Sequence, residues 1–346
     1  MNTHSRPQWP FRLIATAAVT ALALAALVVP ALASANNDKV DGVRAEINRG
    51  TLSVKGGDGG QQVALRLKAG DPNTVQVDAG DNGSADFSFD RSAVDAINVK
   101  MGDGNDLVRI DDANGSFTGD PNTGDSTPTT IAGGDGNDTL LGAQNPPAGP
   151  AANQVETYRG GDGNDTIDGG RGNDTAHLGG GNDTFRWDPG EGSDVIEGQD
   201  GSDTMLFNGA PGTDNVTLSP NGGRLDFFRA QGTIHMDTND VEIADFNALA
   251  GADTVLVNDL TGTDVTQTNL DLGGTDGAVD SVDVKGTDGV DNINVQGNGS
   301  DVDVTGLATA DSVKNAEPTD HLNVHTLGGA DNVVQNAGGL IQLLVD

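Results

Sequence analysis

Between residues 101 and 208, apolar and polar positions repeat with a period of nine residues. When the chain is written in rows of nine, the eighth position is apolar and its two neighbours are mostly polar. The rows begin at Met101, Gly133, Gly160, Gly169, Leu178, Pro189 and Gly198. Their eighth residues are Val108, Leu140, Ile167, Ala176, Phe185, Ile196 and Met205. Because strand side chains alternate between two faces, each row predicts a three-residue strand at positions 7–9, with position 8 facing the core.

A loop rich in glycine and acid precedes each of these strands. Positions 2 and 4 are mostly Gly, position 5 is mostly Asn, and position 6 is always Asp. Glycine permits backbone angles closed to other residues, and Asn is one of the few others that tolerate the left-handed region. A chain that turns back every nine residues makes one coil from two rows, with parallel strands and loops on alternate sides. We therefore expect loop 160–165 to stack on loop 178–183, and loop 169–174 to lie on the other side.

The flanking residues predict further short strands. In residues 36–100, runs such as "VALRLKAG" and "AINVKMG" alternate apolar and polar residues between glycine turns. In residues 209–346, an acid precedes several alternating β-branched runs. These acids are Asp253, Asp280, Asp291, Asp301 and Asp331. The Pro-rich run 143–154 predicts a surface loop. The fold class expected is all-β: a parallel β-roll or β-solenoid with short strands, divided into regions 36–100, 101–208 and 209–346.

The N-terminus has the features of an export signal. Two arginines precede an apolar run at 13–29, and Ala33 and Ala35 each end a small-x-small pattern. We expect residues 1–35 to be a cleaved signal peptide, and the protein to be secreted or displayed at the cell surface. The alternative is an uncleaved anchor, since the run is slightly long for a signal core.

The composition indicates that folding needs a further source of free energy, because rows this polar cannot fold through an apolar core alone. The 346 residues carry a net charge of −34 and only 3% aromatics, which is typical of disorder unless something supplies ordering energy. This acidity disfavours nucleic acid as a partner. The chain has no cysteine, so disulfides and thiolate metal sites are excluded.

Stacked loops would bring aspartates such as Asp165 and Asp183 close together. A hard dication between them would turn their repulsion into attraction, and loop carbonyls can complete the oxygen shell that calcium accepts. Magnesium fits less well, because it prefers a small octahedron with retained waters.

The row "GGDGNDTID" and its neighbours resemble the glycine- and aspartate-rich nonapeptide of the repeats-in-toxin family, which forms a calcium-filled parallel β-roll. The resemblance implies that position 6 supplies a carboxylate to Ca²⁺ and that positions 2 and 4 supply carbonyls. The implied metal ligands are Gly102, Gly104, Asp106, Gly134, Gly136, Asp138, Gly161, Gly163, Asp165, Gly170, Gly172, Asp174, Gly179, Gly181, Asp183, Asp194 and Asp203. Two rows depart from the family pattern: one has Gln199 at position 2, and another follows a two-residue insertion, Trp187 and Asp188.

Other features carry less weight. His321 and His325 would lie about 13 Å apart on a strand, too far to share a zinc ion. The run "TGDSTP" at 123–128 suggests a hydrolase serine, but no second catalytic motif accompanies it. We expect Asp168, at outward position 9, and the acids after residue 250 to be solvated.

The sequence therefore favours an exported, non-enzymatic calcium-binding protein with a structural or adhesive role at the cell surface or outside the cell. The alternative is a secreted hydrolase, of protease or lipase type, that carries the repeats as an accessory scaffold. A third hypothesis is that one face of the solenoid binds carbohydrate or ice, which would need a flat exposed array of Thr or aromatic residues. Calcium is the expected cofactor, and membrane contact is expected only through an uncleaved N-terminal segment.

Overall fold

The computed structural model describes residues 39–118, 126–144 and 154–346, and nearly all regular structure in these ranges is β-strand. Within them, the helical element is a single 3₁₀ turn, η1 (Arg91–Ala93). The all-β fold class is confirmed. The predicted signal peptide lies outside the described residues, as do residues 145–153 of the Pro-rich run.

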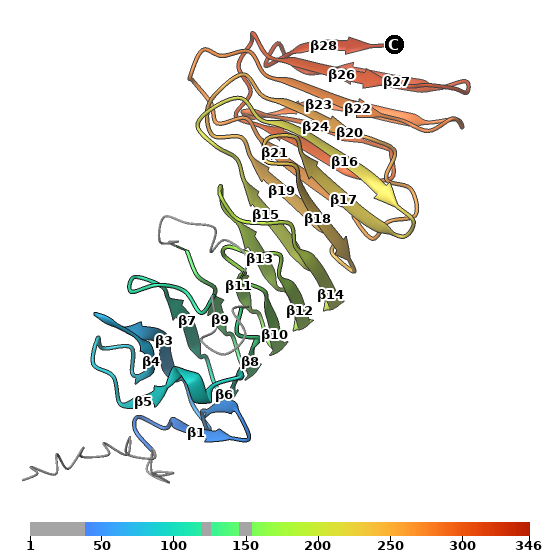
Figure 1. Ribbon diagram of the computed structural model, residues 1–346. Helices are drawn as coiled ribbons and strands as arrows, with labels where there is room; N and C mark the ends of the chain where they lie inside the picture. Colours follow the sequence, from blue (N-terminus) through green and yellow to red (C-terminus); the bar gives the residue numbers. More distant parts are fainter. Residues whose placement is uncertain (1–38, 119–125, 145–153) are drawn as a thin grey trace, which may run out of the picture. The chain divides into compact units, whose positions relative to one another are not determined.

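The strands of the described residues form two long sheets (Figure 1). The first sheet has the spatial order β1 (Arg44–Asn48), β2 (Thr51–Lys55), β6 (Ala96–Asp103), β8 (Thr129–Asp135), β10 (Glu156–Asp162), β12 (Thr175–Gly181), β14 (Val195–Gly201), β18 (Ile234–Asn239), β17 (Arg224–Arg229), β16 (Asn215–Asn221), β20 (Thr254–Val257), β22 (Ser281–Lys285), β26 (His321–His325) and β28 (Gln342–Val345).

The second sheet has the order β27 (Asn332–Asn336), β23 (Asn292–Asn298), β24 (Asp301–Thr305), β25 (Ala310–Lys314), β21 (Gln267–Asp271), β19 (Ile243–Asn247), β15 (Thr204–Asn208), β13 (Thr184–Trp187), β11 (Thr166–Asp168), β9 (Thr139–Leu141), β7 (Leu107–Asp111), β3 (Gln62–Lys68), β4 (Asp71–Ala79) and β5 (Phe87–Asp90).

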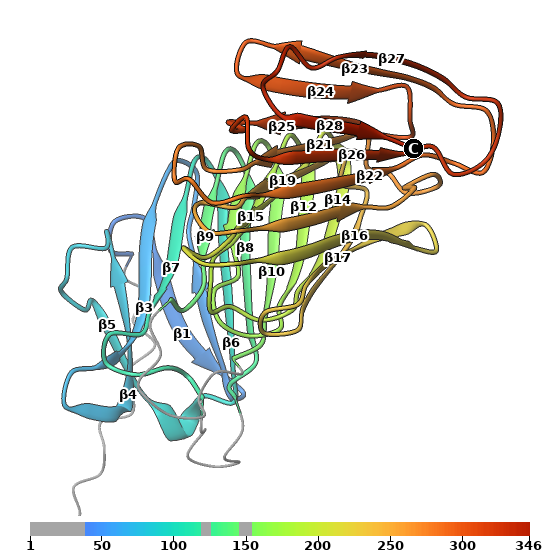
Figure 2. The ribbon, with the colours of Figure 1, turned by 90° about the horizontal axis from the view of Figure 1, so that it is seen from above.

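Most neighbouring strands are parallel, because the chain visits the two sheets alternately and advances one rung at each return. In the dense rows one coil takes 18 residues: Ile167 of β11 pairs with Phe185 of β13, and Tyr158 of β10 pairs with Ala176 of β12. Figure 2 shows β8, β10, β12 and β14 side by side. Antiparallel hairpins interrupt the regular order at β16–β18 and β23–β25, and others add β1, β4 and β5 at the N-terminal rungs.

The core lies between the sheets and follows position 8 of the rows. All seven of the position-8 residues named above have 0% exposure, so the predicted inner ladder is confirmed. Around the insertion the core is aromatic, with the rings of Trp187 and Phe207 stacked 4.0 Å apart. Burying the ladder supplies apolar stabilisation at about 25 cal/mol per Å², although each row contributes only one or two buried apolar side chains.

The predicted strand length of three residues holds in two strands of the second sheet, while the other row strands of that sheet, β7, β13 and β15, have four or five residues. Strands β9 and β11 have the expected three residues, whereas β8, β10, β12 and β14 each have seven. The longer strands continue through the glycine pair of the next row, because that glycine backbone also forms ladder bonds, as between Gly161 and Gly179.

The predicted flanking strands form, and both sheets continue across residues 100 and 208. Strand β6 itself crosses residue 100. The division into three regions stays a prediction, since one pair of sheets runs through all of them. In the described part of the chain, no helix is long and apolar enough to cross a membrane.

Candidate metal centre

The loops between the sheets stack in two columns, as the row pattern predicts. The first loop column contains loops 102–106, 134–138, 161–165, 179–183 and 199–203, and it leads into the second sheet. The second loop column contains loops 170–174 and 190–194, and it leads back into the first sheet. Loop 160–165 stacks on loop 178–183, with Gly161 opposite Gly179 and Asp162 opposite Gly180. The expected separation of these loops from loop 169–174 is confirmed.

Each loop requires glycine for two reasons: its backbone has positive φ angles, and there is no room for a Cβ atom. Gly161 and Gly163 have φ angles of +133° and +129°. A Cβ on Gly161 would lie 1.9 Å from the carbonyl oxygen of Gly134 in the preceding rung. Glycine therefore brings loop carbonyls of successive rungs into close stacking. Gln199 occupies the equivalent place in a later row and itself has a φ of +74°.

The position-6 aspartates form a hydrogen-bonded ladder along each column. The backbone N–H of Asp138 donates to Oδ1 of Asp165 at 2.7 Å, and that of Asp165 donates to Oδ1 of Asp183 at the same distance. The same bond joins Asp106 to Asp138, and it joins Asp183 to Asp203. Each carboxylate is therefore held in place by the rung before it.

In the second column, the N–H of Asp174 donates to Oδ1 of Asp194 at 2.8 Å. Asp194 keeps the ladder position although Trp187 and Asp188 are inserted before its row. The structure thus brings together the predicted acids of five rows in one column and of two rows in the other. The insertion leaves the frame of the second column intact.

The second carboxylate oxygen of each row aspartate is buried without a hydrogen-bond partner. This holds for Oδ2 of Asp106, Asp138, Asp165, Asp174, Asp183, Asp194 and Asp203. Burying an unpartnered charged oxygen is costly, and a divalent cation is the partner that a column of such oxygens beside glycine carbonyls can accept. The chemistry of the donor set therefore fits a hard, oxygen-seeking ion such as Ca²⁺.

Burial raises the pKa of these carboxyls. It raises the pKa of Asp138 to about 6 and those of Asp165 and Asp203 to about 7, chiefly through desolvation and also through neighbouring carboxylates. The pKa of Asp174 rises to about 9, from desolvation first and then from the charge of Glu156. Ionising these acids together costs free energy unless a cation lies close to them.

The role expected for Asn at position 5 is wrong. None of the row asparagines has a positive φ angle. Their side chains instead form a second ladder: the N–H of Asn164 donates to Oδ1 of Asn137 at 2.8 Å, and that of Asn182 donates to Oδ1 of Asn164 at 2.9 Å. Asn is suited to this place because its amide oxygen accepts the N–H of the next rung.

One further row ends at Arg159, directly before Gly160, and the row pattern above did not reveal it. Its position 6 is Glu156, whose N–H donates to Oδ1 of Asp174 at 2.7 Å, and its position 8 is the fully buried Tyr158. Oε2 of Glu156 is buried without a partner, like the aspartate oxygens. The signal in the sequence is "ETYR" directly before Gly160, with an acid, an outward Thr and an apolar ring in frame.

The expectation that Asp168 is a solvated surface acid is wrong. Asp168 has 0% exposure, accepts the N–H of Gly170 and the Nε2–H of Gln144, and is paired with Arg186. Position 9 of this row is therefore enclosed by partners from other segments of the chain and does not face water.

The expectation for the acids after residue 250 is also wrong in the rows that continue the ladder. Asp253, Asp280 and Asp291 are buried. The N–H of Asp253 donates to Oδ1 of Asp280 at 2.8 Å. The local pattern of a buried acid with an inward residue two positions later, as in Asp253 and Val255, therefore persists where the double glycines are lost, although the spacing between rows changes.

In these C-terminal rows the second carboxylate oxygen is often occupied by the row's own loop. Oδ2 of Asp214 accepts the N–H of Ala210, and Oδ2 of Asp320 accepts that of Glu317. Asp291 does the same with the N–H of Thr287. Asp253 is an exception, because its Oδ2 is buried without a partner. Where a backbone N–H fills the place, no ion is needed to satisfy the carboxylate.

His321 and His325 lie on strand β26, as the β assignment requires. The ring nitrogens of His325 lie 2.7 and 2.8 Å from carboxylate oxygens of Asp346 and Asp283. These bonds raise the pKa of His325, the bond to Asp283 most. The ring is thus partnered by acids on both sides.

Comparison with known proteins agrees with the geometry. The family model described as the RTX calcium-binding nonapeptide repeat, in four copies, matches residues 123–144, 153–185 and 190–214. Searches of curated proteins and of solved structures returned no significant match to this chain. The row at Met101 lies outside the matched residues, yet Gly102 pairs with Gly134 in the same array. These residues therefore carry RTX calcium-binding nonapeptide repeats, and RTX nonapeptide repeats bind Ca²⁺.

Proposed function

We propose that this calcium-binding repeat protein is exported and non-enzymatic, and that it serves as a structural or adhesive element outside the cell or at its surface. In this proposal the two loop columns hold Ca²⁺ between successive rungs. The ligands are the position-6 aspartates from Asp106 to Asp203 with the carbonyls of their glycines, and Glu156 joins the second column.

The observation that carries the proposal is the unpartnered second oxygen at every row aspartate. One oxygen of each carboxylate is used by the ladder, so its position is set before an ion arrives. The other oxygen is buried beside the loop backbone and has no protein donor. The contrast with Asp214, Asp291 and Asp320, whose second oxygens accept loop N–H groups, supports a calcium requirement centred on residues 101–208. Asp253 is the later row acid whose second oxygen resembles those of residues 101–208.

Calcium would supply positive charge and would bind the second carboxylate oxygens, which have no hydrogen-bond donor in the protein. The chain's own residues then act by position: the glycines let carbonyls stack, the N–H ladder orients the carboxylates, and position 8 anchors each rung in the core. Because a preformed site rarely exists in an unfolded chain, binding free energy becomes folding free energy.

Far-UV circular dichroism of metal-free protein, followed by addition of calcium, tests this. We expect β structure in residues 101–208 to increase on adding calcium, and Asp183→Asn to weaken binding in the first column more than in the second. A full β spectrum in protein shown to be metal-free, with no change on adding calcium, would contradict the proposal.

The non-enzymatic role is supported by the architecture of the described residues. One pair of sheets runs from β1 to β28, and the buried hydrophobic residues belong to the core between these two sheets. Screening the purified protein against protease, lipase and esterase substrates tests this part. Turnover that is lost with a single serine substitution would favour the alternative of a hydrolase with an accessory repeat scaffold.

Export is supported by the charged start, the apolar run and the small-residue pattern of residues 1–35. RTX repeat proteins are typically secreted. Fractionation of cells and medium tests it: we expect the chain in the medium or on the cell surface.

A further inference from the structure

The two-residue insertion before the row at Pro189 builds a turn that no other row contains. Residues 188–191 are Asp-Pro-Gly-Glu, with Pro189 and Gly190 in the central positions and Gly190 at a φ of +109°. Pro followed by a positive-φ Gly is the sequence preference of a type II turn. The turn closes with the N–H of Glu191 donating to the carbonyl of Asp188 at 3.2 Å.

This turn folds the Glu191 side chain back toward the body of the protein. Its Oε2 accepts the N–H of Asp188 at 2.7 Å. Glu191 occupies row position 3, where the acids of other rows, such as Asp135 and Asp162, are exposed. Glu191 is instead only 8% exposed. The insertion therefore turns a surface acid into a buried one.

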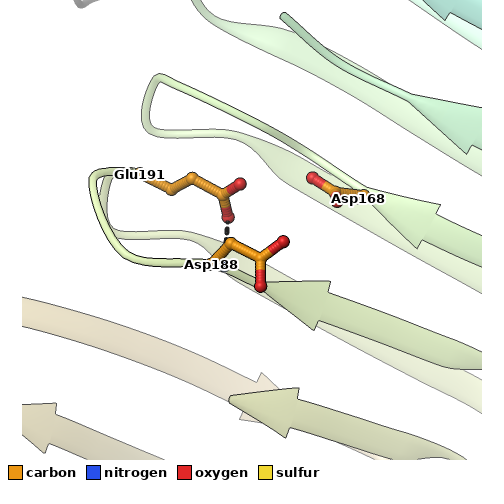
Figure 3. Close-up of side chains that lie close together, drawn as sticks. All are labelled: Asp168, Asp188 and Glu191. Atoms are coloured by element: carbon orange, nitrogen blue, oxygen red, sulfur yellow. Dashed lines mark hydrogen bonds between the residues drawn. The ribbon is translucent and has the colours of Figure 1, made fainter. Parts of the chain in front are cut away.

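Three carboxylates converge at this corner, as Figure 3 shows. Asp168 comes from the end of β11, Asp188 follows the end of the neighbouring strand β13, and Glu191 comes from the turn. One carboxylate oxygen of each lies within 4.8 Å of the others. None of the three occupies position 6 of a row, so they are separate from the two aspartate ladders.

The cluster has excess negative charge and an unused ligand atom. Arg186 is the cation paired with it, with Nη2 3.0 Å from Oδ2 of Asp188 and a second contact to Asp168. Burial first, and then the charge of Asp168, raise the pKa of Glu191 to about 9. When all three carboxylates are ionised, as they would be around a bound cation, one guanidinium leaves two negative charges. Oε1 of Glu191 is buried and has no hydrogen-bond partner. The remaining oxygens have donors in Gln144, Gly170 and Asn208.

We propose that Asp168, Asp188 and Glu191 form an additional binding site for a divalent cation of the calcium class. One dication balances the two uncompensated charges and gives Oε1 of Glu191 the partner it lacks. All available ligands are hard oxygens, the kind that calcium prefers and that softer metals do not select.

The spacing of the three oxygens is compatible with a single calcium ion. Two ligands of one ion cannot be farther apart than twice the metal–oxygen distance, which is about 4.6–5.2 Å for calcium and about 4.0–4.2 Å for magnesium. The 4.8 Å limit on the cluster lies within the range for calcium. Arg186 contacts Oδ2 of Asp168 and Oδ2 of Asp188, and these contacts help to fix the orientation of both carboxylates.

Counting bound calcium on the full chain tests the site. We would measure calcium per chain by equilibrium dialysis and atomic absorption for wild type, Glu191→Gln, Asp188→Asn and a control, Asp200→Asn. Glutamine keeps an oxygen acceptor for the N–H of Asp188 but removes the charge. Asp200 is the exposed position-3 acid of the next row, so its substitution makes the same charge change away from the cluster.

We expect Glu191→Gln and Asp188→Asn each to bind one calcium ion fewer than wild type, and Asp200→Asn to bind the full number. Circular dichroism in saturating calcium checks folding, and Asp188→Asn carries the test if Glu191→Gln does not fold. Wild-type counts in both cluster variants would overturn this site alone. An equal loss in Asp200→Asn would also overturn it, since the acids would then be collecting counterions. A wild-type chain that binds no calcium would overturn this site and the proposed function together.

Discussion

Without calcium, the protein should lose stability as the pH rises from about 4 to about 7, because row carboxyls titrate in that window. The pKa values of Asp165 and Asp203 are each raised from 3.8 to about 7, mainly by burial. The folded state therefore binds more protons than the unfolded state between those values. Stability is fully present below the unfolded pKa and is lost as the pH rises through the folded one.

The size of the effect follows from these values. The difference of about three pH units corresponds to about 4 kcal/mol per carboxyl at 1.36 kcal/mol per unit. We halve this to about 2 kcal/mol, since charges in such loops behave as if the surrounding dielectric constant were about 20. Asp165 and Asp203 together then account for about 4 kcal/mol, a large part of the 5–15 kcal/mol typical of a folded domain.

The assay is urea unfolding of metal-free protein, followed by far-UV circular dichroism at about pH 4.5 and about pH 8. Protonated row carboxyls should let residues 101–208 keep β structure at the lower pH without calcium, and its loss at the higher pH is what calcium should restore. Asp165→Asn should reduce the difference in unfolding free energy between the two pH values by about 2 kcal/mol, because asparagine has no proton to lose. Asp162→Asn is the matched control: it makes the same charge change in the same loop at an exposed side chain, and should alter the difference by less than about 0.5 kcal/mol.

Two results would refute this reasoning. One is a metal-free wild-type protein that becomes more stable as the pH rises over this range. The other is an equal effect of Asp165→Asn and Asp162→Asn, which would attribute the pH dependence to the overall charge of −34 and not to the buried carboxyls. With calcium bound, the trend should reverse, since protons then compete with the ion.

Three further outcomes are expected. Gly161→Ala should prevent the first column from stacking, since its Cβ would lie 1.9 Å from a carbonyl oxygen at a φ of +133°, whereas Gly180→Ala meets only ordinary contacts; calcium titration of the two variants compares them. Asp168→Ala should destabilise the protein by about 1–3 kcal/mol in urea unfolding, because Gln144, the N–H of Gly170 and Arg186 all lose the buried carboxylate that accepts from them; a change below about 0.5 kcal/mol would mean that these contacts contribute nothing. N-terminal sequencing of exported protein should begin within residues 34–36, and full-length chain in the membrane fraction would indicate an anchor instead.

The sequence by itself determined the repeating unit of this protein. A nine-residue frame with an inward residue such as Ile167, a position-6 acid such as Asp165 and paired glycines needs only local rules: strand alternation and the conformational freedom of glycine. The period of 18 residues per coil followed from two rows turning in opposite directions. Because a stacked repeat places identical positions above one another, the loop columns could also be deduced.

The tertiary structure alone decided which acids are buried and what satisfies them. Asp168 looks like a surface residue in its row, but its partner Arg186 comes from 18 residues further along the chain, and its neighbour Glu191 comes from the turn that the insertion builds. Asp320 looks like a turn acid, yet its Oδ1 accepts the N–H of Asp280 from 40 residues earlier. No local pattern encodes such partners, because hydrogen bonds between rungs join segments whose spacing changes with every inserted hairpin.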